Sequence, residues 1–85
     1  IAGIVEENEI TFTAFPNPAI DRLIIYPQTN NGIFNLYDIQ GRILLQYNFS
    51  SSSAFTIDVN DLSRGNYIIE IASDDFRQSS KLILE

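Results

Sequence analysis

Histidine and cysteine are both absent from this 85-residue chain. Without them the sequence lacks the commonest general base, the usual nitrogen and sulfur ligands of metal ions, and a thiol nucleophile. Carboxylates remain, but a glycosidase-type pair needs a substrate cleft, and so small a domain has little room for one. We therefore expect no enzyme activity and no cofactor, and no disulfide can form.

Basic residues are also scarce. Five Lys and Arg stand against eleven Asp and Glu, which gives a formal net charge of −6 and repels phosphate backbones and anionic lipid headgroups. No apolar run approaches the roughly 18 to 20 residues that cross a bilayer as a helix. The sequence thus argues against nucleic-acid binding and against direct membrane insertion. Because the chain begins with Ile and opens without a signal-peptide pattern, we expect it to be a piece of a longer polypeptide.

Short apolar stretches are what the chain does contain. Hydrophobic residues make up 45% of it, enough for the core of one domain. Runs of β-branched and aromatic residues recur about every ten residues, which is typical of an all-β sandwich or barrel. Their apolar residues alternate with a period of two rather than with helical spacing. Seven strands are predicted: Ile10 to Phe15, Leu23 to Tyr26, Ile33 to Tyr37, Ile43 to Phe49, Phe55 to Val59, Tyr67 to Ile71 and Ser79 to Leu84.

All three prolines lie around the first two predicted strands. Pro16 and Pro18 cannot donate a ladder hydrogen bond, so the first strand must end before them, and Pro27 ends the second strand. Asn17 is expected to bond nearby backbone and so to stiffen the crossing. Further on, Asn31-Gly32 tolerates positive φ and predicts a tight hairpin turn before the third strand.

The segment after the fifth strand interrupts the alternating pattern. Asn60 or Asp61 can cap a single helical turn there, and Gly65 can close it. Leu62 is expected to fill the core. Tyr67 comes two residues after Gly65. Its hydroxyl could therefore reach back to the preceding loop, as in the tyrosine corner of Greek-key sandwiches.

Two acidic clusters allow a metal-binding interpretation. Asp58, Asn60 and Asp61 place several oxygens within four residues, and Asp74 and Asp75 form a second pair. Calcium takes six to eight such oxygen ligands. However, neither cluster has the spacing of an EF-hand loop, and Asp and Asn are the ordinary residues of turns and caps. We therefore favour turn formation over metal binding at both places.

The aromatic residues also allow two interpretations. They could form an exposed platform on which sugars stack, or they could fill the core. We favour the core, because large rings are needed to fill the roughly 10 Å between two packed sheets. The residues concerned are Phe34, Tyr37, Tyr47, Phe49, Phe55 and Tyr67.

Four sequence blocks follow one another along the chain: FPNPAIDRLII, FNLYDIQGRIL, IDVNDLSRGNYIIEI and KLILE. Together they resemble the type A C-terminal sorting domain of the type IX secretion system, the Por secretion system of Bacteroidetes. Its pattern is Tyr-Pro-Asn-Pro, a strand, a Tyr-Asp-x-x-Gly-Lys turn, Leu-x-x-Gly-x-Tyr, and a last strand that opens with Lys. Here Phe15 replaces the first Tyr, Arg42 replaces the turn Lys, and the end lacks a further basic residue. The matching positions are Pro16, Asn17, Pro18, Leu23, Ile25, Tyr37, Asp38, Gly41, Leu62, Gly65, Tyr67 and Lys81.

The resemblance implies a seven-stranded, immunoglobulin-like antiparallel β-sandwich of Greek-key type that acts as a secretion address on a cargo protein. It implies passage through the periplasm and recognition by shuttle and outer-membrane translocon proteins. It also implies cleavage upstream of the domain by a cell-surface sortase, so that the cargo is secreted or stays on the cell surface. In this interpretation residues 1–9 are the linker from the cargo and residues 10–85 are the sorting domain, which is a substrate and not a catalyst.

We expect the secretion machinery to recognise the last strand, because a terminal edge strand can add to a partner's sheet. Its residues are Lys81, Leu82, Ile83, Leu84 and Glu85. Two alternatives remain open. A carbohydrate- or protein-binding accessory sandwich of a secreted enzyme would have an exposed aromatic cluster, and a structural spacer would neither bind nor direct export. A sorting signal must also end its parent protein, whereas the other two kinds of domain can lie anywhere.

Overall fold

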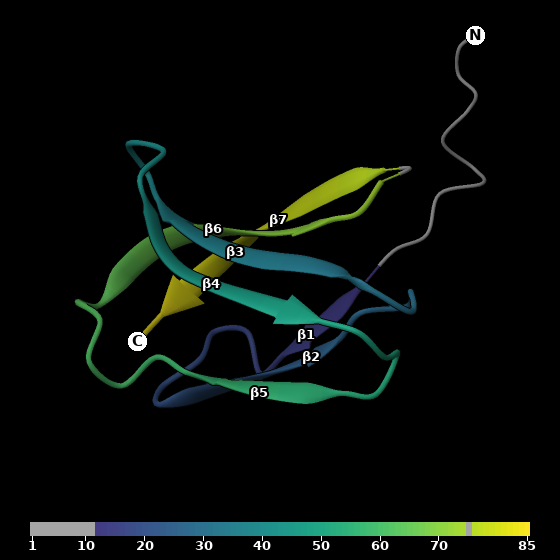
Figure 1. Ribbon diagram of the computed structural model, residues 1–85. Coiled ribbons are helices and arrows are strands. Elements are labelled where there is room, and N and C mark those ends of the chain that lie inside the picture. Colours follow the sequence, from purple (N-terminus) through teal and green to yellow (C-terminus); the bar gives the residue numbers. More distant parts are fainter. Residues whose placement is uncertain (1–11, 75) are drawn as a thin grey trace, which may run out of the picture.

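A computed structural model describes residues 12–74 and 76–85. They form seven strands in two antiparallel sheets, one in the order β1-β2-β5 and one in the order β4-β3-β6-β7 (Figure 1). The strands are β1 (Thr13–Phe15), β2 (Arg22–Tyr26), β3 (Gly32–Asp38), β4 (Ile43–Phe49), β5 (Phe55–Asp58), β6 (Gly65–Ala72) and β7 (Arg77–Leu84). No helix capable of crossing a membrane occurs in the described ranges.

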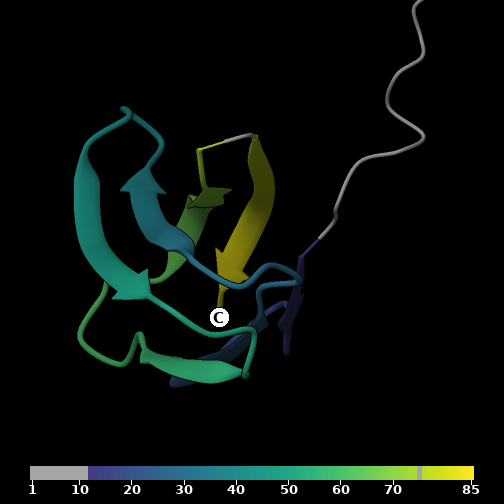
Figure 2. The same ribbon diagram turned by 45° about the vertical axis from the view of Figure 1, so that its right-hand side comes forward.

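The two sheets face each other and share one core (Figures 1 and 2). Leu23 and Ile25 of β2 have no exposed surface, and neither do Phe34 and Leu36 of β3. Alternate residues of each strand thus enter the core, as the period of a pleated strand requires. Each such side chain contributes roughly 1.5 to 3 kcal/mol when it is fully buried. The whole cluster is Phe12, Ala19, Leu23, Ile25, Phe34, Leu36, Phe49, Ile57, Val59, Tyr67, Ile69, Ile71, Leu82 and Leu84.

All seven predicted strands are present; β4 has the predicted bounds, and the other strands differ at one or both ends. β1 begins at Thr13; the predicted start at Ile10 and the predicted linker 1–9 lie outside the described residues. β6 and β7 are longer than predicted, because β6 pairs with β7 along its whole length, from Gly65 opposite Leu84 to Ala72 opposite Arg77. A backbone ladder does not depend on apolar side chains, so polar and glycine residues can extend a strand beyond its hydrophobic run.

The predicted hairpin turn at Asn31-Gly32 is wrong. β2 lies in one sheet and β3 in the other, so the chain crosses between the sheets at this point. Gly32 has no positive φ; the left-handed residue of the connection is Gln28, at φ 63°. A Cβ on Gly32 would lie 2.6 Å from the Ala72 carbonyl oxygen. Glycine is therefore needed at position 32 for close backbone approach to β6 and not for a turn.

A ladder of polar side chains crosses the outer face of the four-stranded sheet. Gln46 donates to Asn35 (2.8 Å), Asn35 donates to Glu70 (3.0 Å), and Tyr37 donates to the same Glu70 oxygen (2.6 Å). Arg77 adds an ion pair to Glu70 at 3.6 Å. Asn35 and Glu70 are buried but satisfied, which avoids the cost of an unpaired polar group. The bond to Glu70 is the main cause that raises the pKa of Tyr37 above its usual value.

The aromatic residues divide between core and surface. Phe34, Phe49 and Tyr67 are buried in the core, as predicted, and Phe55 packs against it. Core placement is wrong for Tyr37, which belongs to the polar ladder, and for Tyr47, whose side chain is 46% exposed beside Phe55. β4 is an edge strand, so its inward-facing side chains are covered on one side only. The six residues thus form no common exposed platform for sugars.

Candidate functional site at the motif end

The four sequence blocks meet at one end of the molecule, which we call the motif end: Asn17, Asp38–Arg42, Arg64–Tyr67 and Lys81–Glu85. In Figure 1 the β3–β4 turn, the start of β6 and the end of β7 all lie on the left. The sheet register brings Asp38 opposite Tyr67 and Gly65 opposite Leu84. Residues far apart in sequence are therefore neighbours here, because all four strands of one sheet begin or end at this place.

The Pro-Asn-Pro block closes the outer edge of β7. The Asn17 amide donates to the Lys81 carbonyl (3.0 Å) and accepts from the Ile83 N–H (3.1 Å). Ala19 donates to the Ile83 carbonyl and accepts from the Glu85 N–H, both at 2.8 Å, in a parallel bridge beside Leu84. Two predictions are thus corrected: Asn17 bonds a distant strand and not nearby backbone, and the edge of β7 over residues 81–85 is not unpaired.

Strand ends around this block agree with the proline interpretation. β1 ends at Phe15, directly before Pro16, and β2 ends at Tyr26, directly before Pro27. The Phe15–Pro16 and Asn17–Pro18 peptide bonds are both cis. Proline has no N–H to offer a neighbouring strand. The Asn17 side chain supplies a donor and an acceptor in its place.

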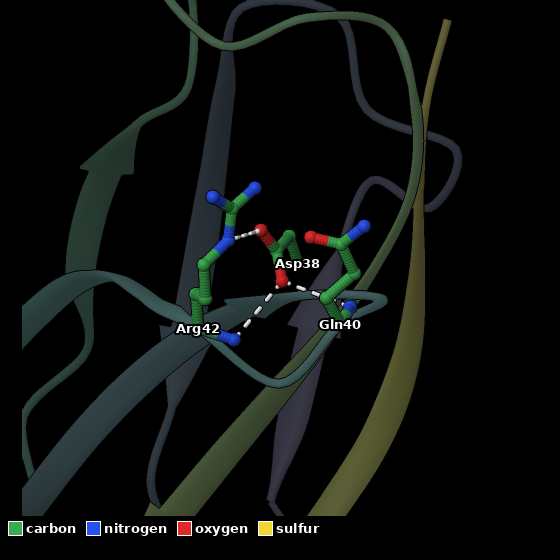
Figure 3. Close-up of polar contacts among 3 residues, drawn as sticks. All are labelled: Asp38, Gln40 and Arg42. Atoms are coloured by element: carbon green, nitrogen blue, oxygen red, sulfur yellow. Dashed lines mark hydrogen bonds and ion pairs between the residues drawn. The ribbon is translucent and has the colours of Figure 1, made fainter.

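Asp38 organises the tight turn between β3 and β4 (Figure 3). Its Oδ1 accepts the backbone N–H groups of Gln40 (2.9 Å) and Arg42 (3.0 Å), and its Oδ2 accepts Nε of Arg42 at 2.7 Å. The backbone N–H of Arg42 is the largest of these influences, and together they hold the pKa of Asp38 below its usual value. Gly41 has φ 88°, which favours glycine. The turn leaves Ile39 at its tip 74% exposed.

The loop before β6 differs from its prediction. Asp58, and not Asn60 or Asp61, provides the cap, by accepting the Asn60 N–H at 2.9 Å. One backbone bond, from Leu62 to Val59 at 3.2 Å, makes a turn rather than a helix. Leu62 packs against the core but is only partly buried.

The predicted tyrosine corner is confirmed. The Tyr67 hydroxyl donates to the Ser63 carbonyl while the ring is buried in the core. The sheet thus holds the preceding loop through one side chain, as Greek-key sandwiches do at the corresponding place.

Arg64 is the residue that sequence reasoning missed. Its guanidinium donates to carbonyls of its own loop, those of Leu62 (2.7 Å), Val59 (3.0 Å) and Asn60 (3.3 Å). It also donates to the carbonyls of Ile20 and Glu85, which ties the loop to the β1–β2 connection and to the end of β7. The one signal in the sequence was the position of Arg64 directly before a turn glycine, because a guanidinium there can donate to several carbonyls of the loop.

The motif end contains a shallow, open hollow rather than an active-site cleft. Its volume is about 360 Å³, and it lies between the β3–β4 turn and the start of β6. No group of three or more His, Cys, Asp or Glu side chains could hold a metal ion within residues 12–74 and 76–85. Asp58 is used as a cap, whereas the predicted Asp74–Asp75 pair lies partly outside the described residues.

Lys81 differs from the four arginines. Arg22, Arg42 and Arg77 each lie in an ion pair, and Arg64 is held by carbonyl oxygens. Across the described part of the chain, the exposed Lys81 side chain has no anionic partner. It is therefore a cation whose charge is available to another molecule.

One comparison with known proteins supports the resemblance to a sorting domain. A family model described as the secretion system C-terminal sorting domain matches residues 13–85. No curated protein and no solved structure matches the chain significantly. The matched range includes every motif position at the end described above. The chain belongs to the family of secretion system C-terminal sorting domains, the sorting signals of type IX secretion.

Proposed function

We propose that the type IX secretion machinery recognises this domain at the motif end, chiefly through the exposed side chains of Lys81, Ile83 and Glu85 and the loops beside them. One observation carries the proposal: the chain's single unpaired cation among the described residues stands on the strand that the Pro-Asn-Pro block closes. A cation without an internal ion pair can pair with a carboxylate of a partner protein without first breaking a contact within its own chain.

The backbone of the last strand is not the recognition element in this proposal. Asn17 and Ala19 already satisfy the outward groups of residues 81, 83 and 85. Adding a partner strand there would first break these four hydrogen bonds. Recognition through side chains needs no such rearrangement.

The fold that presents this surface is proposed to be an immunoglobulin-like Greek-key sandwich. Three observations support it. The chain crosses between the two sheets after β2, after β4 and after β5, as in Greek-key sandwiches. Ala19 lies in the connection between β1 and β2, which both belong to the three-stranded sheet, and it forms a parallel bridge with Leu84 of β7 in the four-stranded sheet. Tyr67 forms a tyrosine corner.

The cargo's route is proposed to run through the periplasm to the outer-membrane translocon, with shuttle and sortase proteins as further partners. A cell-surface sortase would cut upstream of the sandwich, near or before residues 1–9, and release the cargo to the surface or the medium. The domain itself acts as a substrate in these steps. Its open hollow has Asp38 as the one carboxylate among its lining residues, and this supports a recognition surface over acid–base catalysis by a carboxylate pair.

An export assay tests this proposal. A reporter followed by residues 1–85 is expressed in a bacterium that has the type IX system, and exported reporter is measured. Lys81→Gln is expected to reduce export at least about tenfold, corresponding to 1.4 kcal/mol of recognition, and Lys81→Arg is expected to retain it. Arg22→Gln removes the same charge from the other sheet and should export normally.

Substitutions are preferable to deletion of residues 81–85, because Leu82 and Leu84 are core residues and their loss would unfold the domain. Circular dichroism of each purified variant establishes that it is folded. Normal export of a folded Lys81→Gln variant would overturn the proposed role of the cation.

A further inference from the structure

One side of the molecule is formed by two open sheet edges. β4 ends the four-stranded sheet and β5 ends the three-stranded sheet. The two strands follow one another in the chain, and their aromatic rings meet: Tyr47 lies 4.7 Å and Phe49 5.4 Å from Phe55 between ring centroids. Figure 2 shows β4 and β5 at the same side of the sheets. We call this the uncharged side, comprising residues 43–57.

The uncharged side differs in composition from the rest of this acidic chain. From Ile43 to Ile57 there is no Asp, Glu, Lys, Arg or Pro. Ile43 is 52% exposed, Leu44 40% and Tyr47 46%. Exposed apolar side chains beside the outward backbone groups of an edge strand are a common feature of association sites.

The other edge strands have protective features that β4 lacks. β7 is closed by Asn17 and Ala19 and has the charge of Lys81. β1 has three residues and β5 has four, whereas β4 has seven. Charges, short length and covering segments are the usual means by which edges avoid pairing. A bulge opposite Leu36/Tyr37 disturbs only the start of β4 and leaves its pairing regular from Leu45 to Phe49.

We propose that β4 pairs antiparallel with β4 of a second copy of this chain, joining two four-stranded sheets into one continuous sheet. A two-fold axis across the strand lets the outward N–H groups of each copy donate to the outward C=O groups of the other. The charge pattern favours a second copy at this place. Two chains of net charge −6 repel each other, and the uncharged side is where they meet without facing carboxylates.

The self-association is tested by measuring molar mass by light scattering between about 10 µM and 1 mM chain, a range suited to weak dimers. We expect the mass to rise from that of the monomer toward twice that value. Salt should strengthen the dimer, because it screens the repulsion between acidic chains while leaving strand pairing intact. A constant monomer mass across this range, at low and high salt, would overturn the proposal.

Matched substitutions locate the contact. Asn48→Glu places like charges across the proposed seam and should weaken dimerisation at least about tenfold. Ser79→Glu makes the same charge change at an exposed position on β7, the opposite edge of the sheet, and should change the dimerisation constant only slightly. Leu44→Glu is a second variant on β4 should Asn48→Glu fail to fold. Equal effects of the β4 and β7 variants would overturn the assignment to β4.

Cross-linking gives an independent readout, because the chain has no native cysteine. Gln46 lies at the centre of β4 (Ile43–Phe49), where a two-fold axis across the strand brings it beside Gln46 of the second copy. Gln46→Cys should therefore form a disulfide between copies under mild oxidation, and Ser79→Cys should not. A cross-link with both variants alike would contradict the geometry. These measurements use the purified chain alone, so their outcome is separate from the export assay.

Discussion

The two edges of the four-stranded sheet differ in whether their outward backbone groups are hydrogen-bonded to a covering segment. Over residues 81–85, β7 is closed by hydrogen bonds from Asn17 and Ala19. β4, at the other end of the same sheet, pairs with β3 on one side and has no strand on its outer side among the described residues. The comparison teaches that a block of the sorting motif stabilises the fold by covering the backbone of an edge strand. The exposed side chains of that strand are the ones proposed above for recognition.

The closed edge depends on a side chain because the covering segment contains two prolines. Pro16 and Pro18 have no N–H, so the segment between β1 and β2 cannot pair as an ordinary strand. The Asn17 amide takes over one donor and one acceptor position, and Ala19 completes the edge through its own backbone. Within residues 12–74 and 76–85 the open edge has no such segment, because the loop after β4 leads directly to β5 in the other sheet.

The largest expected contrast between the two edges concerns leucine. Leu82 of β7 has no exposed surface, whereas Leu44 of β4 is 40% exposed. Leu82→Ala should therefore destabilise the domain by about 3 kcal/mol through lost burial and the cavity left behind. Leu44→Ala should cost less than about 0.5 kcal/mol. Urea unfolding of both variants measures the difference, and equal losses would show that β4 is covered in solution.

Asparagine provides the next contrast. Asn17→Ala removes two hydrogen bonds to β7 and should lower the free energy of unfolding by about 2 kcal/mol, at about 1 kcal/mol for each bond. Amide exchange at Ile83, whose N–H loses its acceptor, should quicken in this variant. Asn48→Ala on the open edge should change stability by less than about 0.5 kcal/mol. Unchanged exchange at Ile83 would contradict closure of this edge by Asn17.

Tyrosine hydroxyls give a smaller contrast. The Tyr67 hydroxyl is bonded to the Ser63 carbonyl, whereas Tyr47 is half exposed at the open edge. Tyr67→Phe should lower the free energy of unfolding by about 1 kcal/mol, and Tyr47→Phe should leave it unchanged. Thermal unfolding of the two variants provides the measurement. A neutral Tyr67→Phe would mean that the tyrosine corner contributes no net stability.

The smallest expected effect lies in the turn that leads into the open edge. Because hydrogen bonds, above all from the Arg42 N–H, lower the pKa of Asp38, its charged form is favoured in the folded state. This stabilisation is present above the unfolded pKa of about 3.9 and is lost as the pH falls through the lower folded pKa. Carboxyl NMR titration should find a lowered Asp38 pKa that rises in Arg42→Gln. An Asp38 pKa at the usual value would remove this contribution.

The positions of the strands were predictable, because alternation and turn residues act locally. The same is true of the tyrosine corner at Tyr67, since the glycine turn lies directly before it. The role of Asn17 was not predictable: its partners lie 64 and 66 residues further along the chain. Arg64 was missed for a similar reason, because the Glu85 carbonyl reaches it only after β6 and β7 have paired.

By itself the sequence determined the strands, the absence of histidine and cysteine chemistry, and the family, because composition, periodicity and motif order can be read without a fold. Only the tertiary structure decided which motif residues stabilise and which remain available. Asn17 is used to close an edge, and Lys81 has no anionic partner among the described residues. Glu70, which is not a motif residue, is buried within the polar ladder. The physical reason is that hydrogen bonds and burial depend on distance in space, and strand pairing across the sheet sets that distance.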